Sequence, residues 1–114
     1  MGVDPARVFK TLIAEVDGTY LVAIVPVLAE IDLRALGKRA AMAKPADAER
    51  ITGYVTGGIS PLGQRKRLPT LLDESALASE TVYVSAGRRG LEIELAPADL
   101  IALTRATERP IARR

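Results

Sequence analysis

Two segments near the end of the chain alternate apolar and polar residues on either side of a short turn. Residues 81–85 read Thr-Val-Tyr-Val-Ser and residues 91–95 read Leu-Glu-Ile-Glu-Leu, and Gly87 and Gly90 lie in the turn between them. Alternation places successive side chains on opposite faces of a strand, and glycine permits the positive φ angles of a tight turn. The pattern predicts a β-hairpin, so the fold must contain antiparallel pairing.

An earlier pair of apolar segments predicts a second hairpin. Residues 8–16 and residues 19–25 are rich in β-branched and apolar residues, and Asp17-Gly18 separates them. An Asp-Gly pair between two such runs is typical of a two-residue hairpin turn. Because residues 19–25 are almost continuously apolar, we expect this strand to be largely buried.

Three short helices are predicted around these hairpins. Asp32 is a candidate N-cap for a helix over residues 33–40. Prolines open the other two, over residues 46–51 before Gly53 and from Pro97 onward. Strands joined by hairpins and interleaved with helices predict an α+β fold rather than a regular parallel sheet.

The length of 114 residues fits a single domain. We place this domain at residues 1–104. Residues 105–114 are polar and basic, and we expect them to form a frayed, flexible tail.

The chain contains no cysteine and no histidine. A cysteine nucleophile, a Ser-His-Asp relay, a disulfide and a typical zinc site are therefore excluded. Catalysis would have to use lysine, hydroxyl or carboxylate side chains, backbone N–H groups, or a group that the substrate brings. No apolar run approaches the roughly 20 residues of a membrane span, and signal-peptide features are missing. We expect a cytoplasmic protein with no membrane partner.

The glycine-rich loop that begins at Gly57 is the strongest candidate for a ligand site. Gly57 and Gly58 allow the backbone to approach a ligand closely, and Pro61 stiffens the loop. A bare loop beside positive charge suits carbonyl or phosphate oxygens. The alternative is an ordinary glycine turn with a solvated charged flank. The cations that follow the loop are Arg65, Lys66 and Arg67.

The positive charge of the chain is concentrated in two segments. Residues 50–72 hold four cations and no carboxylate, and residues 81–91 add Arg88 and Arg89 without an acid. If the segments meet in space, they form a positive surface on a protein whose net charge is only +2. Such a surface fits contact with an RNA backbone. The alternative is two unrelated exposed turns.

Several blocks of the sequence, in order, resemble one known family. Residues 3–5 and 9–12, then 52–64, 81–91 and 96–100, are similar to the YbaK-type Cys-tRNA(Pro) deacylases. These are related to the editing domain inserted in bacterial prolyl-tRNA synthetases. The resemblance implies a mixed, largely antiparallel, barrel-like sheet flanked by short helices. It also implies a trans-editing deacylase that removes cysteine from mischarged tRNA(Pro), with the cysteine thiol attacking its own ester.

The resemblance also implies roles for particular residues. Lys10 and the loop glycines Gly57 and Gly58 are the expected catalytic residues, with Lys10 supplying charge to a phosphate or an oxyanion. The alternatives are an exposed strand lysine and residues that only pack or turn the chain. Expected substrate contacts are Thr11, Ile59, Ser60, Pro61, Ser85, Gly87 and Glu92. Expected tRNA contacts are Arg65, Lys66, Arg67, Arg88 and Arg89.

The expected partner is mischarged tRNA(Pro), and no cofactor or metal is expected. A prolyl-tRNA synthetase is a further candidate partner. We expect the helix and first strand that precede residues 9–11 in the family to be absent from this chain, which would expose core surface and favour a homodimer. The alternatives in function are a catalytically weak homologue that only binds tRNA or a synthetase, and an editing enzyme for another amino acid such as alanine.

Overall fold

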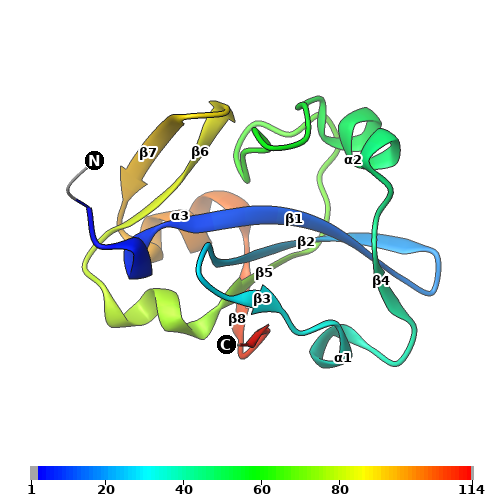
Figure 1. The fold of residues 1–114 in the computed structure, drawn as a ribbon, viewed down its shortest axis with the longest axis horizontal. Coiled ribbons are helices and arrows are strands. Elements are labelled where there is room, and N and C mark those ends of the chain that lie inside the picture. Colours follow the sequence, from blue (N-terminus) through cyan, green and yellow to red (C-terminus); the bar gives the residue numbers. More distant parts are fainter. Residues whose placement is uncertain (1–2, 114) are drawn as a thin grey trace.

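A long hairpin runs through the centre of the molecule (Figure 1). In the computed structural model, which describes residues 3–113, β1 (Phe9–Val16) and β2 (Thr19–Pro26) pair antiparallel from Phe9–Pro26 to Val16–Thr19. Asp17 and Gly18 both have positive φ angles, 50° and 80°, as a two-residue turn requires. The predicted first hairpin is confirmed. Met1, Gly2 and Arg114, parts of the predicted domain and tail, lie outside the described residues.

Three further strands extend this hairpin into a mixed sheet of order β4-β1-β2-β5-β8. The antiparallel neighbour of β1 is β4 (Ala40–Met42), whereas β5 (Thr70–Asp73) and β8 (Thr107–Arg109) continue the sheet in parallel. A small antiparallel pair joins β3 (Glu30–Ile31) to β9 (Ala112–Arg113). The predicted α+β class with mixed, mostly antiparallel pairing is confirmed. The strands described form an open sheet and not a closed barrel.

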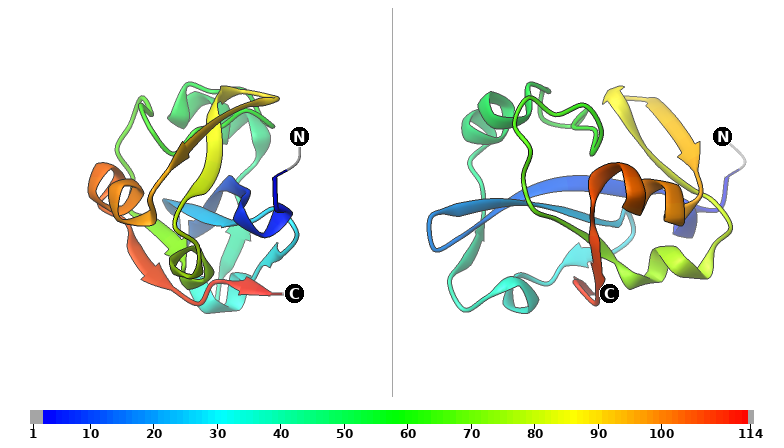
Figure 2. Two further views of the ribbon diagram at one scale, coloured as in Figure 1. Left: turned by 90° about the vertical axis from the view of Figure 1, so that its left-hand side faces the viewer. Right: turned by 180° about the vertical axis from the view of Figure 1, so that it is seen from behind.

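The second predicted hairpin forms a separate two-stranded sheet. It consists of β6 (Val82–Arg88) and β7 (Leu91–Leu95), with a register shift between Ser85 and Arg88. Strand β6 lies beside the start of β1, because Tyr83 forms a parallel β-bridge with Val8. Figure 2 shows the hairpin on the same side of the central sheet as α2.

The first predicted helix is shorter than expected. Asp32 caps α1 (Leu33–Leu36), and its side chain accepts a hydrogen bond from the N–H of Arg34. The helix ends at Gly37, whose φ of 156° lies outside the helical region. The prediction of a helix to residue 40 is therefore wrong, because Ala40 already begins β4.

The other two helices match the expectation from their prolines. α2 (Pro45–Thr52) ends at Gly53 with φ 83°, and α3 (Pro97–Thr104) follows β7. Two 3₁₀ turns, η1 (Pro5–Arg7) and η2 (Glu74–Ala78), complete the elements. Within residues 3–113, the helices lack the length and apolar character needed to cross a membrane.

Strand β2 is buried on both faces, as predicted. Val22 and Ile24 belong to the main apolar cluster, whereas Ala23 and Val25 pack with Ile111 on the opposite side. This division follows the two-residue period of a strand. The main cluster lies toward the β6–β7 hairpin, α2 and α3, and its buried members are Phe9, Ile13, Val22, Ile24, Ala48, Ile59, Leu72, Ala76, Val82, Val84 and Leu100.

The prediction of a frayed tail after residue 104 is wrong for the part that the structure describes. β8 pairs with β5, β9 pairs with β3, and the Ile111 side chain is fully buried. The buried carboxylate of Asp73 accepts hydrogen bonds from the N–H groups of Ile111 and Ala112, both at 2.9 Å. One apolar residue within a polar segment, and an acid far away in the sequence, are enough to anchor it.

We expect Asp73→Ala to destabilise the protein by about 2–4 kcal/mol, because it leaves buried N–H groups unpaired. Hydrogen exchange of residues 107–113 should accelerate more than exchange in β1. Asp99→Ala, which alters an exposed acid in the first turn of α3, is the control and should cost less than about 1 kcal/mol. Urea titration and amide exchange measure both effects. Equal losses for the two variants would contradict the anchoring role.

Candidate functional site

A cavity of about 490 Å³ lies between β1, the glycine loop and the β6–β7 hairpin. Strand β1 contributes residues 9–13, the loop contributes Thr56, Gly57 and Ile59, and the hairpin contributes Ser85 and Glu92. The remaining wall is mostly apolar and consists of Val27, Met42, Ala43, Pro45 and Ala48. Three segments that are far apart in the sequence therefore share one concave site.

Lys10 and Glu92 are the ionisable side chains among the described residues that line this cavity. They do not form an ion pair with each other. Burial raises the pKa of the Glu92 carboxyl above its usual value, because removal from water disfavours the charged form. The cavity thus presents one cation and one carboxylate in a largely apolar surround.

Two buried polar atoms of the cavity residues have no hydrogen-bond partner in the described chain. They are Thr11 Oγ1, on a side chain that is 7% exposed, and Glu92 Oε2. A buried polar atom without a partner costs free energy. Such atoms, when they lie in a cavity, are suited to a polar ligand that supplies the missing hydrogen bonds.

Tyr54 holds the glycine loop in place. Its hydroxyl donates a 2.6 Å hydrogen bond to the carbonyl of Leu62, and its ring packs against Gly87, where a Cβ atom would lie 2.9 Å from Cε1. The carboxylate of Glu49 accepts a hydrogen bond from the N–H of Thr56 at 2.8 Å, which lowers the pKa of Glu49. The loop is therefore tied both to α2 and to the hairpin.

The two cation-rich segments meet at the paired glycines. A Cβ atom on Gly58 would lie 3.0 Å from the backbone nitrogen of Arg89 and 3.1 Å from Arg88 Cα. On Gly57, whose φ is 91°, it would lie 2.6 Å from Nη2 of the Arg89 guanidinium. The alternative of two unrelated exposed turns is therefore wrong. Gly58 permits backbone packing, and Gly57 leaves room for the Arg89 side chain at the cavity.

Six of the residues predicted to act on the substrate line the cavity: Lys10, Thr11, Gly57, Ile59, Ser85 and Glu92. The N–H groups of Gly57 and Ile59 donate no hydrogen bond within the described part of the chain. The N–H of Gly58, by contrast, donates to the carbonyl of Val55 at 2.9 Å and is committed to the turn.

Other predicted site residues lie elsewhere in the loop. Ser60 is only 2% exposed, its hydroxyl accepts from the N–H of Leu62, and its carbonyl accepts from the side chain of Gln64. These contacts support the loop and leave Ser60 outside the cavity. Pro61 is buried on the far side of the loop, where it lines a second cavity of about 340 Å³ with Lys66, Arg67 and the end of α3. Gly87 packs on Tyr54, and Arg65, Arg88 and Arg89 are exposed.

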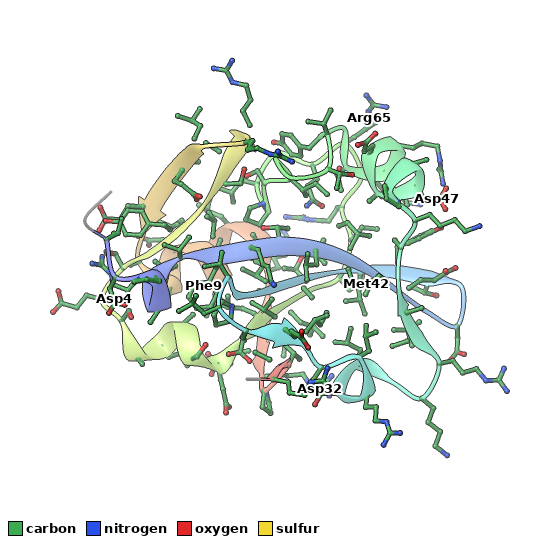
Figure 3. All side chains as sticks on the ribbon, in the orientation of Figure 1. Asp4, Phe9, Asp32, Met42, Asp47 and Arg65 are labelled. Carbon is green, nitrogen blue, oxygen red and sulfur yellow. The ribbon has the colours of Figure 1, made fainter. Side chains whose placement is uncertain are left out.

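The apolar wall of the cavity was not predicted from the sequence. Met42, from the end of β4, and Phe9, from the start of β1, both line it (Figure 3). Val27 and Met42 are also partly open to solvent, with 39% and 43% exposure. No local motif marks these residues, because the wall is assembled from β1, the residue after β2, the end of β4 and α2.

A family model for the aminoacyl-tRNA editing domain matches residues 1–103. The chain belongs to the aminoacyl-tRNA editing domain family. Editing domains of this family are aminoacyl-tRNA deacylases, so the predicted enzyme class is confirmed at this level and aminoacylated tRNA is the substrate class. The predicted resemblance is confirmed as well.

Known relatives agree with this assignment. The chain is 41% identical over 110 residues to EbsC of Enterococcus faecalis strain V583, provisionally named a Cys-tRNA(Pro)/Cys-tRNA(Cys) deacylase, and the match covers 91% of this chain and 67% of EbsC. A crystal structure provisionally described as a trans-editing enzyme for prolyl-tRNA synthetase matches with a TM-score of 0.90 and 25% identity, covering 99% of this editing domain and 74% of that chain. A structure from work on computational epitope grafting matches in fold, with a TM-score of 0.92, 24% identity, and 99% and 76% coverage.

The glycine loop of the editing domain provides a test of its packing. We expect Gly58→Ala to destabilise it by about 2–3 kcal/mol, because the added methyl group meets backbone atoms of the hairpin. Gly90→Ala, at φ 84° with open space around it, is the control and should cost about 1 kcal/mol of backbone strain. Gly57→Ala should resemble this control, since the exposed Arg89 side chain can move aside. Urea titration compares them, and a Gly58→Ala cost no larger than the others would refute the packing role.

Glu92→Gln should stabilise the editing domain slightly at neutral pH, which raises its Tm. Because burial raises the pKa of Glu92, the folded state binds its proton more readily, and stability falls as pH rises through that pKa. The amide removes this loss, so the gain should shrink at about pH 3.5, below the usual carboxyl pKa. Calorimetry at both pH values tests this, with exposed Glu80→Gln as control. A gain that does not depend on pH would refute the explanation.

Proposed function

We propose that this editing domain hydrolytically clears cysteine from mischarged tRNA(Pro), with assistance from the substrate's own thiol. The observation that carries the proposal is the cavity in which Lys10, Glu92 and Thr11 surround space for a small esterified group. The chain has neither cysteine nor histidine to act as a nucleophile or a base. A substrate that brings its own nucleophile fits this inventory. The provisional name of EbsC supports the same substrate.

The charges of the cavity match the groups of an aminoacyl ester. Glu92 is the partner for the α-ammonium group, whose binding would compensate the desolvated carboxylate. The N–H groups of Gly57 and Ile59 are the donors for the ester carbonyl or the terminal ribose. Lys10 supplies positive charge to the developing oxyanion or to the terminal phosphate. Thr11 offers a further hydroxyl to the bound group.

The proposed chemistry needs no protein nucleophile. The thiolate of the substrate attacks its own carbonyl carbon, so that a C–S bond forms and the C–O bond to the ribose breaks. The thiol proton goes to the released ribose oxygen, and the amino acid leaves as a thiolactone that water then opens. A thiol with a pKa of about 8.5 is partly ionised near neutral pH. Alanine has no such group, and the hydroxyl of serine is far less nucleophilic, so this route selects cysteine by reactivity.

The exposed arginines beside the cavity are the proposed contacts for the RNA backbone. Arg89 lies against Gly57 at the cavity, Arg88 is its neighbour in the hairpin, and Arg65 lies on the outer side of the loop near α2 (Figure 3). Lys66 and Arg67, beside the second cavity, extend this positive surface. Contacts with phosphates make affinity depend on salt.

Further partners remain proposals. Prolyl-tRNA synthetase is the proposed source of the mischarged tRNA, and the cytoplasm is the proposed location. Leu28 is 71% exposed next to Val27 at the cavity wall, which supports the proposed homodimer through an apolar contact.

Lys10→Ala should lower kcat/KM for Cys-tRNA(Pro) by roughly 10²–10³-fold, the size expected when one charge-stabilising group is removed. Lys38→Ala, which removes an exposed lysine outside the cavity, is the matched control and should leave kcat/KM within about twofold. Release of labelled amino acid from the charged tRNA is the measurement. Ala- and Ser-charged tRNA(Pro) should be cleared far more slowly than the cysteine ester.

Either of two results would overturn the proposal. Faster release of alanine than of cysteine would assign the domain to editing of another amino acid. Retained tRNA binding without release of any amino acid above background would indicate a domain that only binds tRNA.

A further inference from the structure

The hairpin that carries Ser85 and Glu92 is not part of the central sheet. Its strands β6 and β7 pair with each other, and a single parallel bridge from Tyr83 to Val8 links them to the strands around β1 in the described chain. Lys10 and Thr11, which also line the cavity, belong to β1. The position of Glu92 relative to β1 therefore depends on what fixes the hairpin against the start of that strand.

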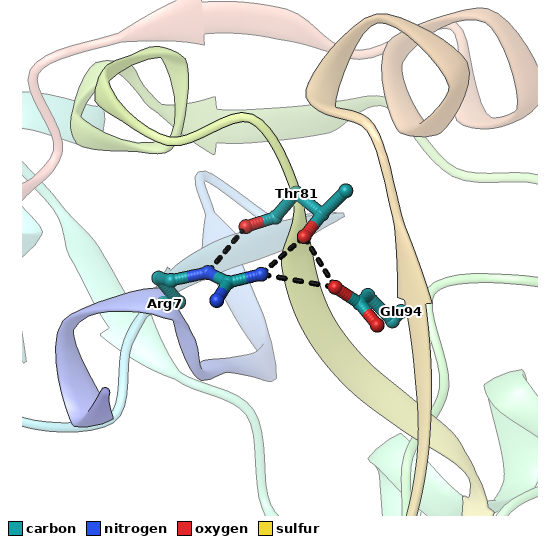
Figure 4. Close-up of polar contacts among 3 residues, drawn as sticks. All are labelled: Arg7, Thr81 and Glu94. Carbon is teal, nitrogen blue, oxygen red and sulfur yellow. Dashed lines mark hydrogen bonds and ion pairs between the residues drawn. The ribbon is translucent and has the colours of Figure 1, made fainter. Parts of the chain in front are cut away.

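Arg7 provides this link through several contacts at once (Figure 4). From η1, its Nε donates to the carbonyl of Thr81 at 3.0 Å and its Nη2 contacts Glu94 Oε2 at 2.9 Å. The same Nη2 donates to the Thr81 hydroxyl, which in turn donates to Glu94. The guanidinium carbon also lies 5.2 Å from the centre of the Tyr83 ring. One side chain thus holds both strands of the hairpin.

The strand register places this network next to the cavity. Tyr83 pairs with Glu94, and Ser85 pairs with Glu92. Residues two apart on a strand point to the same face, so these four side chains share one face of the hairpin. The Tyr83–Glu94 pair contacts Arg7, and the next pair along lines the cavity. The two pairs are separated by two residues, or about 6.6 Å along a strand.

We propose that Arg7 is a positioning residue of the editing site, which fixes Glu92 in the cavity lining by holding the face of the hairpin that Glu92 shares with Glu94 and Tyr83. Arg7 does not line the cavity and would not touch the substrate. The catalytic part of this proposal rests on the proposed deacylase function. The positioning part rests on the contacts alone.

The chemistry of arginine is needed for this role. A guanidinium offers several donors in a planar fork, and it stacks on aromatic rings. A lysine keeps the charge but has a single nitrogen, which cannot bridge the Thr81 carbonyl and Glu94 in the same way. Arg7→Lys therefore separates loss of the fork from loss of the charge.

The first experiment follows the Glu92 carboxyl by NMR titration in the wild type, Arg7→Ala and Arg7→Lys. Two effects of Arg7→Ala have opposite signs. Loss of a nearby positive charge alone would raise the pKa of Glu92, whereas a displaced hairpin would expose the carboxyl to water and lower its pKa toward the usual value. Lys10 in the cavity lining, Glu94 on the same face of the hairpin and Arg89 against Gly57 at the cavity are the other charged groups near Glu92, and all three are retained in these variants.

The second experiment is a double-mutant cycle in deacylation of Cys-tRNA(Pro). We expect Glu92→Gln to lower kcat/KM about tenfold or more in the wild type but less than threefold in Arg7→Ala, because the carboxylate is already misplaced there. The control is Arg113→Ala, which breaks an exposed pair with Glu30 in the β3–β9 sheet. In that background, Glu92→Gln should keep its full effect. Glu94→Gln replaces Arg7→Ala if the latter does not fold.

The outcomes are distinct. A lowered Glu92 pKa in both Arg7 variants and a non-additive cycle support the proposal. A Glu92 pKa that is unchanged or raised in both variants, or effects that multiply within about twofold, overturn it. If the wild type releases no amino acid from Cys-, Ala- or Ser-charged tRNA(Pro), the deacylase proposal fails, and the NMR titration alone decides whether Arg7 positions Glu92.

Discussion

The attachment of the β6–β7 hairpin to the rest of the molecule is the contact on which the site depends. The hairpin is held at one end by Arg7 and at the other by the close backbone packing of Gly58 against Arg88 and Arg89. Between these two points its buried valines, Val82 and Val84, join the main apolar cluster. The cavity is the space left between the two attachment points. Its shape is therefore set by contacts outside its lining.

Local features of the fold could be predicted from the sequence, and distant pairings could not. Both hairpins follow from alternation and from turn residues such as Asp17-Gly18, and the first helix follows from the Asp32 cap. The ordered segment after residue 104 was mispredicted, because its anchor is Asp73, more than 30 positions earlier. Polarity alone suggested a solvated tail, whereas a single buried Ile111 and two hydrogen bonds to one carboxylate are enough to order it.

The candidate site was only partly predictable for a related reason. The family resemblance marks residues 57–61 as one motif, but the structure divides them between two tasks. Gly57 and Ile59 line the cavity, whereas Gly58 and Ser60 support the loop through packing and hydrogen bonds. A motif records that residues occur together and not which of them face a ligand. The apolar wall carries no motif, because several elements that are separate in the sequence each contribute one or two residues to it.

The unpaired polar atoms of the cavity lower the stability of the protein when no ligand is bound. Thr11 Oγ1 and Glu92 Oε2 are buried without hydrogen-bond partners among residues 3–113, and burial raises the pKa of Glu92. A core selected only for stability would pair such groups or replace them with apolar ones. A ligand that carries an ammonium group and hydrogen-bonding atoms would recover this lost free energy on binding. The recovered free energy would strengthen binding and fix the orientation of the substrate. The recovery requires that Glu92 be held in place before the substrate arrives, because a mobile carboxylate would relax into water and remove the penalty that makes binding selective.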